Sequence, residues 1–194
     1  MEDFWFYVKM GLDHVLDLGA YDHILFLSAL AVPFTFKQWK SVVLLATVFT
    51  VTHCLSLFLS VYGIITVEVS LIEFLIPVTI VLTALYNIIK LRGGQEGQNL
   101  FWHLGATAFF GLVHGFGFSN YFKMLVAGLE ERVAPLLGFA LGIEVSQVII
   151  VVLVLLLAYV LQVLLHIKQS HFVLWASSLI LLITIPLLWN TFPW

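Results

Sequence analysis

Long apolar runs constrain this chain more than any other feature of its sequence. Runs near or above the roughly 18–20 residues needed to cross a bilayer recur along it, and residues 133–165 contain a single charged side chain, Glu144. Of the 194 residues, 62% are hydrophobic and 10% are charged, whereas a soluble domain is about 25% charged. The chain is therefore expected to be an integral membrane protein.

The polar breaks between these runs predict an all-α polytopic membrane helix bundle in one domain, residues 1–194. Residues 3–18 are aromatic but carry several charges, so they predict an interfacial or partly inserted N-terminal helix. Six transmembrane helices are expected at about 21–36, 41–62, 68–89, 100–122, 133–165 and 172–189. The fifth is longer than a bilayer requires, so it must tilt, kink or project. No internal repeat is evident, which argues against an inverted-repeat transporter.

The placement of lysine and arginine predicts the orientation. Five of these residues fall in the loops after the first, third and fifth spans, and three on the opposite side: Lys37, Lys40, Lys90, Arg92 and Lys168, against Lys9, Lys123 and Arg132. Because basic residues favour the cytoplasmic side, both termini are expected outside the cytoplasm.

Several classes of protein are disfavoured by composition. The net charge of −3 comes without a basic arm or acidic tail, so nucleic acid is not an expected partner. The single cysteine, Cys54, excludes an intrachain disulfide. The first residues lack the basic region of a signal peptide, so no cleavable leader is expected.

Acidic and imidazole side chains recur at a similar depth on several predicted helices, and such groups are costly in a membrane unless they pair or bind a ligand. His53, for example, lies about 18 Å from the inner end of its span at 1.5 Å per residue, and His114 lies in the outer half of its own. The candidate metal ligands are His14, Asp22, His23, His53, Glu73, His114 and Glu144.

Three or more imidazoles with several carboxylates suit a divalent transition metal such as nickel, zinc, cobalt or copper. Asp22 and His23 are adjacent, so one of them can bind the metal while the other orients a neighbour. Gly111, Gly115 and Gly117 would allow close approach of neighbouring helices around His114.

Simpler explanations exist for some of these residues. A single histidine within a span, such as His53, can serve only to hydrogen-bond across helices. Asp13 and Asp17 can be solvated charges at the membrane boundary, and His103 fits an interfacial role. Three hydroxyls are expected to bond back to their own helices: Thr50, Thr52 and Ser146.

An ordered series of motifs resembles the HupE/UreJ family of small bacterial membrane proteins. The motifs are His14 with Asp22-His-Ile-Leu-Phe26, Phe49-Thr-Val-Thr-His53, Glu73 with Asn87, Phe110-Gly-Leu-Val-His-Gly-Phe-Gly-Phe118, and Gly142-Ile-Glu-Val-Ser-Gln147. The resemblance implies a small polytopic protein of the bacterial inner membrane, a metal permease of a family whose members are associated with nickel supply to hydrogenase or urease.

The chain departs from the nickel permeases of that family at two places. Seven residues separate His14 from Asp22, which is a longer gap than the family motif has. The permease motif Phe-His-Gly-x-Ala-His-Gly-x-Glu contains two histidines, and the corresponding segment around His114 keeps only the second. The chain thus resembles a divergent branch.

The first functional hypothesis is a divalent-metal permease or facilitator whose site opens to the extracytoplasmic side. Its partners would be the bilayer and the metal ion, and a homo-oligomer is compatible with the sequence. The alternative is a membrane-embedded metal-dependent hydrolase acting on a lipid-like substrate, with Asp22 or Glu73 as general base. A rhomboid-type protease with Ser119 as nucleophile is a weaker third hypothesis, because Gly117-Phe-Ser-Asn120 differs from Gly-x-Ser-Gly. A non-catalytic assembly or sensor protein holding a structural metal would carry the same residues.

Overall fold

The computed structural model describes residues 2–92 and 100–193. Within these residues the chain forms seven α-helices and one short 3-10 helix, with no strand. They are α1 (Glu2–Leu16), α2 (Asp22–Ala31), η1 (Phe36–Gln38), α3 (Trp39–Val61), α4 (Val69–Arg92), α5 (Leu100–Val126), α6 (Val133–Leu164) and α7 (Gln169–Asn190). The all-α fold is as predicted, and part of the polar segment expected between the third and fourth spans lies outside the described residues.

Four helices of the described chain are long and apolar enough to cross a membrane, namely α4, α6, α7 and η1 with α3. α5 has 27 residues but falls outside this group, because its histidines and glycines lower its mean hydropathy. α2 has only 10 residues and spans about 15 Å, half of the hydrocarbon thickness. The prediction of six spans plus an N-terminal helix is therefore met only in part.

The first predicted span is shorter than expected because its helix ends early, at Ala31. At its end, α2 is followed by Pro33, which has no backbone N–H to continue a helix. The backbone N–H of Thr35 then donates to Gln38 Oε1 over 3.0 Å and fixes the turn into η1. Residues 21–36 thus form a half-span and a turn rather than one helix.

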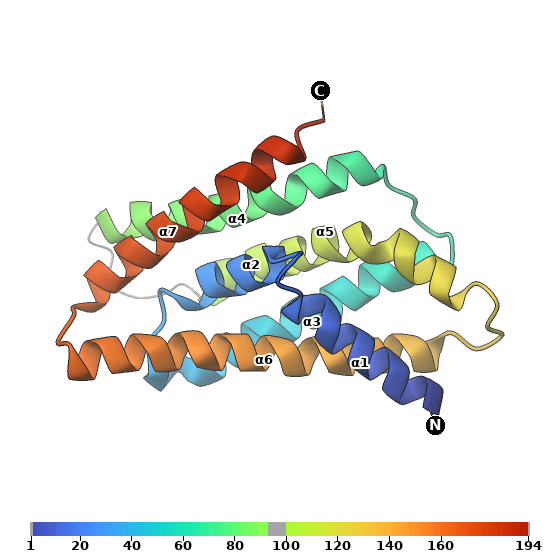
Figure 1. Ribbon diagram of the computed structural model, residues 1–194, viewed down its shortest axis with the longest axis horizontal. Helices are drawn as coiled ribbons and strands as arrows, with labels where there is room; N and C mark the ends of the chain where they lie inside the picture. Colours follow the sequence, from blue (N-terminus) through green and yellow to red (C-terminus); the bar gives the residue numbers. More distant parts are fainter. Residues whose placement is uncertain (1, 93–99, 194) are drawn as a thin grey trace.

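The helices lie roughly along one direction, with α1 crossing the others obliquely (Figure 1). α4 pairs with α7 on one side, α6 runs along the other side next to α1 and α3, and α2 and α5 lie between them. The most extensive contacts join α3 to α5 and α1 to α6. This arrangement places the end of α1, the start of α2 and the middle of α3 and α5 in the interior.

Small residues permit these two close helix contacts. A Cβ atom on Gly142 of α6 would lie 2.8 Å from the backbone nitrogen of Leu12 in α1. A Cβ on Gly111 of α5 would lie 2.8 Å from the backbone oxygen of Phe49 in α3. Both distances are shorter than real Cβ contacts, so glycine is required for the helix backbones to approach this closely. A Cβ on Gly117 would lie 2.9 Å from Ile76 Cδ1 of α4, so the neighbour there is the end of a side chain rather than a helix backbone.

The end of α3 is set by Gly63, whose φ of 71° is readily adopted by glycine alone. The N–H of Ile64 donates to the carbonyl of Leu59 over 2.9 Å, and the N–H of Gly63 donates to that of Ser60 over 3.0 Å. This pair of bonds is the Schellman arrangement that satisfies the last carbonyls of a helix. It ends α3 eight residues after His53 and so fixes how far that histidine lies from the helix end.

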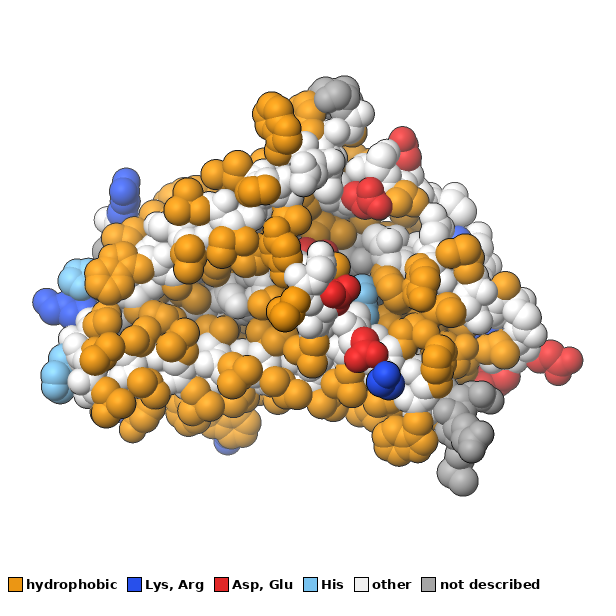
Figure 2. Space-filling view, viewed as in Figure 1, with side chains coloured by type: hydrophobic (Ala, Val, Ile, Leu, Met, Phe, Trp, Pro, Cys, Tyr) orange, Lys and Arg blue, Asp and Glu red, His pale blue; other side chains and the backbone are white. Residues whose placement is uncertain are grey.

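Charged side chains are distributed unevenly over the surface. Basic side chains gather at the end of the molecule where α6 passes into α7, and acidic ones lie toward the opposite end and across the middle of the visible face (Figure 2). Apolar side chains cover most of the remaining surface. An apolar belt between charged ends is typical of a protein embedded in a bilayer.

Candidate metal centre

Four histidines from four helices converge in the interior. His14 is in the last turn of α1, His23 is the second residue of α2, and His53 and His114 lie within α3 and α5. The ring centroid of His23 lies 4.6 Å from that of His14, 5.8 Å from that of His53 and 5.2 Å from that of His114. His23 is thus the centre of the group, which we call the histidine cluster.

The geometry of three members suits a metal ion. One ligand atom from each of His14, His23 and His53 lies within 4.8 Å of the other two. Nitrogens bound to one tetrahedral zinc at 2.0–2.1 Å are about 3.4 Å apart. Modest rotations of the imidazole rings would therefore bring the three nitrogens onto one ion.

Two of the histidines are oriented by hydrogen bonds at the nitrogen that faces away from the cluster. His23 Nδ1 lies 3.1 Å from Asp22 Oδ1, and His114 Nδ1 lies 2.9 Å from the backbone oxygen of Phe110. Since both partners accept hydrogen bonds, Nδ1 carries the proton in each ring. This leaves the lone pair on Nε2, which is the arrangement in which imidazole coordinates a metal.

Five buried imidazole nitrogens of the cluster have no hydrogen-bond partner among the described residues. They are His14 Nε2, His23 Nε2, His114 Nε2 and both nitrogens of His53. His53 is fully buried and His114 is 1% exposed. An unpaired buried polar atom lowers the stability of the fold by roughly 1–3 kcal/mol. Several such atoms occur together in this cluster. A ligand shared by these rings would remove this cost at each nitrogen that it binds.

Aromatic rings enclose the histidine cluster. The Phe118 ring lies 4.0 Å from that of His14 and stacks at 5.1 Å on Phe139. Phe49 contacts His114 at 5.2 Å, and Phe26 contacts it at 5.3 Å. Such a shell excludes water and lowers the local dielectric, which strengthens binding between a cation and its ligands.

One side of the cluster remains open. A groove of about 400 Å³ runs over His14 between α1 and α5 and carries Lys9, Asp13 and Asp17 on its walls. Lys9 and Asp13 form an exposed ion pair of 3.7 Å, and Asp17 Oδ1 accepts the backbone N–H of Gly19. The groove therefore connects a water-facing acidic rim to His14.

The remaining predicted ligands lie elsewhere or act differently. Asp22 contacts His23 and orients its ring. Glu73 is exposed on α4. Glu144 accepts the hydroxyls of Thr47 and Thr50, each over 2.6 Å, between α6 and α3. The structure thus gathers five of the seven candidates, namely the four histidines and Asp22 beside His23.

Several smaller expectations are resolved by these contacts. The hydroxyls of Thr52 and Ser146 bond back to their own helices as expected, whereas that of Thr50 donates to Glu144. Asp17 lies just beyond α1, which ends at Leu16.

The aromatic shell was missed by the sequence interpretation. A signal for it exists, since Phe49 precedes His53 by four residues, and Phe110 and Phe118 stand four residues on either side of His114. Residues four apart lie on the same face of a helix, so this spacing places aromatic rings on the histidine-bearing faces of α3 and α5.

Fold and site together define an integral membrane helix bundle with a buried histidine cluster open to one side. The family model described as HupE / UreJ protein matches residues 1–191. The chain therefore belongs to the HupE/UreJ family, which confirms the resemblance carried by its motifs. No curated protein and no solved structure matches it.

Proposed function

We propose that this protein is a permease or facilitator for a divalent transition metal, with nickel, cobalt, zinc and copper as candidate substrates. The observation that carries the proposal is the set of buried nitrogens without a hydrogen-bond partner on His14, His23, His53 and His114. Imidazole is a good ligand for all four metals. Membership of a family associated with nickel and cobalt transport supports the same conclusion.

The groove over His14 provides a route to the cluster. Asp13 and Asp17 at its rim would raise the local concentration of cations. At the cluster the ion would exchange its water for imidazole nitrogens, and the carboxylate of Asp22 would offset part of its charge through His23. Release would require one or more histidines to withdraw, and the electrical potential or a proton gradient would drive net movement.

Orientation is part of the proposal. The end that carries Lys37, Lys168 and the last turn of α4 would face the cytoplasm of a bacterial inner membrane. The N-terminal half of α1 and the α3–α4 connection would then face outward, so metal would reach the groove from the extracytoplasmic side.

Uptake into proteoliposomes tests the proposal. Purified protein is reconstituted, and the uptake of radiolabelled nickel, cobalt, zinc and copper is compared with that of empty vesicles. We expect uptake of at least one metal, and its loss in His23→Ala and His114→Ala. His171→Ala is the matched control, because His171 is exposed and stacks on Trp175 away from the cluster. Uptake equal to that of empty vesicles for every metal would refute transport.

A hydrolase remains the second candidate, because three histidines beside an open groove match the pattern of a catalytic zinc site with three protein ligands and one free position. It predicts that zinc-loaded protein releases a product from lipid esters or amides, and that His23→Ala abolishes the release. Product formation without metal uptake would favour the hydrolase, and uptake without product would favour the permease.

A further inference from the structure

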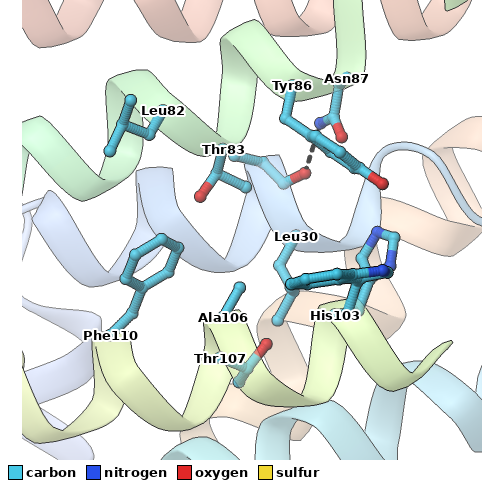
Figure 3. A pocket seen from close by; sticks show the side chains of 11 residues that line it. Leu30, Leu82, Thr83, Tyr86, Asn87, His103, Ala106, Thr107 and Phe110 are labelled. Atoms are coloured by element: carbon cyan, nitrogen blue, oxygen red, sulfur yellow. Dashed lines mark hydrogen bonds between the residues drawn. The ribbon is translucent and has the colours of Figure 1, made fainter. Parts of the chain in front are cut away.

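A second cavity, of about 270 Å³, lies between α2, α4 and α5. Its volume equals that of roughly nine water molecules at about 30 Å³ each. Apolar side chains form most of its wall, with a few polar groups among them (Figure 3). Asn87 on α4 donates to the backbone oxygen of Ala29 on α2 over 2.8 Å and holds one wall in place. We call this space the lateral pocket.

The lateral pocket is separate from the histidine cluster. The ring of Phe110 lines the pocket and packs edge-on against Phe26 at 5.4 Å. Phe26 in turn contacts His114 at 5.3 Å. Two aromatic rings thus separate the two spaces, so a metal bound at the histidine cluster would not fill the pocket.

One hydroxyl points into the pocket without a partner. The side chain of Thr107 is fully buried, and its Oγ1 makes no hydrogen bond. Thr83, across the cavity on α4, shows the usual behaviour, since its hydroxyl donates to the backbone oxygen of Thr79 over 2.8 Å. In Figure 3 the Thr107 hydroxyl is directed into the space between α4 and α5. A ligand with a hydrogen-bond acceptor at this depth would satisfy it.

The pocket reaches the surface of the apolar belt near the basic end of the molecule. Leu82 and Trp102, both in its wall, are 53% and 68% exposed. Lys90 Nζ lies 5.8 Å from the centre of the ring of Tyr86, which also lines the pocket. Tryptophan, tyrosine and lysine together are typical of the level of lipid headgroups, so the pocket extends from that level toward Phe110.

We propose that the lateral pocket binds one anionic phospholipid. An acyl chain occupies the apolar space between α4 and α5, the phosphate lies against Lys90, and the ester carbonyl accepts the hydroxyl of Thr107. Basic pockets between membrane helices bind anionic headgroups in this way. The bound lipid would link α4 to α5. These two helices contact each other less extensively than α3 and α5 do.

Native mass spectrometry of the full chain in nanodiscs tests the proposal. The nanodiscs contain equal amounts of phosphatidylglycerol and phosphatidylcholine, and the retained lipid is identified. We expect the wild type to retain phosphatidylglycerol, and Lys90→Ala to lower the preference about fivefold, the effect of roughly 1 kcal/mol per lysine. Lys40→Ala is the matched control, because Lys40 lies 5.8 Å over Trp39 at the same end but beside no described pocket. Equal losses of this preference in Lys90→Ala and Lys40→Ala would show that the basic end attracts anionic lipid without a defined site. That result would overturn the proposal.

Two further variants test the pocket itself. Ala106→Phe fills the space that Ala106 lines, so the variant should retain neither phosphatidylglycerol nor phosphatidylcholine. Its helix content and monodispersity should be unchanged. The wild type should prefer ester-linked to ether-linked phosphatidylglycerol, because only the ester has a carbonyl that accepts the hydroxyl of Thr107. Thr107→Val keeps the shape of the side chain and removes the hydroxyl, so it should abolish this preference. Retained occupancy in Ala106→Phe would overturn the proposal, as would displacement of the lipid by glycerol 3-phosphate alone. None of these readouts depends on metal transport.

Discussion

The substitution Gly115→Ala tests whether the packing of α5 on α3 positions the metal centre. Gly115 follows His114 directly, and an added Cβ would meet Ser56 Oγ and the backbone of His53. The carbonyl carbon of His53 would lie 2.9 Å from this Cβ, whereas ordinary contacts begin at 3.4 Å. The two helices must therefore separate by at least half an ångström at the residue that carries a cluster imidazole.

The expected cost follows from this overlap. Overpacking of a well-packed interior costs roughly 1–3 kcal/mol, so the free energy of unfolding of Gly115→Ala should fall by that amount. Because the strain is applied at His53, metal affinity should also fall, by about 10–100-fold, which is the range seen when the support of a metal ligand is lost. Gly105→Ala is the matched control on the same helix, since nothing lies within 4 Å of its added Cβ. The control should be neutral or stabilising by about 0.5–1 kcal/mol, as alanine is favoured over glycine in helices.

Two measurements decide the outcome. Denaturant unfolding in detergent gives the stability of both variants, and titration calorimetry with nickel or zinc gives their affinities. If Gly115→Ala matched Gly105→Ala in both, the close approach of α3 and α5 would not position the centre. If stability fell while affinity held, the packing would be structural only and His53 would tolerate displacement.

Three further predictions concern the centre. Asp22→Asn should lower metal affinity about 10–100-fold while leaving the fold intact, because the carboxylate that orients His23 loses its charge; calorimetry would measure this, and unchanged affinity would count against an orienting role. Glu144→Gln should keep metal affinity within about twofold of the wild type and lower stability by roughly 1–3 kcal/mol, because it removes one charged acceptor of the Thr47 and Thr50 hydroxyls; a loss of metal in the same titration would place Glu144 in the centre. Lowering the pH should release the metal, since imidazoles bind it only when neutral, but burial holds the pKa of His14 well below its ordinary value of about 6.5, so release should begin only below that value. Release already complete at pH 6.5 in equilibrium dialysis would contradict ligation by a buried imidazole.

Much of the fold was predictable, because the bilayer thickness sets the length of the apolar runs and the polar breaks mark where the helices end. The bounds of α4 and α6 differ from the predicted spans by three residues or fewer at each end. The first span was not predictable from hydropathy, because residues 21–36 are apolar throughout much of their length while Pro33 interrupts the helix. Local backbone chemistry overrides hydropathy there.

The histidines were easier to predict than the acids. An imidazole in an apolar run has few partners within its own helix, so a shared depth on several helices indicates a shared site. Carboxylates find hydroxyl partners, and Glu144 does so with threonines 94 and 97 residues away in the chain. Such a pairing depends on the rotation of α6 against α3, which the sequence pattern does not specify.

The break between α1 and α2 also affects how the centre assembles. His14 and His23 are joined by a connection of eight residues, and closing so short a loop costs the chain little entropy. His53 and His114 form a second unit, since glycines hold α3 tightly against α5. A bound ion would therefore link α1 and α2 to α3 and α5, in addition to the contacts that already pack α1 on α6 and α2 on α4. It would stabilise this packed state by an amount that rises with the logarithm of the ion concentration relative to its dissociation constant, so the metal supply would add to the packing that holds α1 and α2 in the bundle.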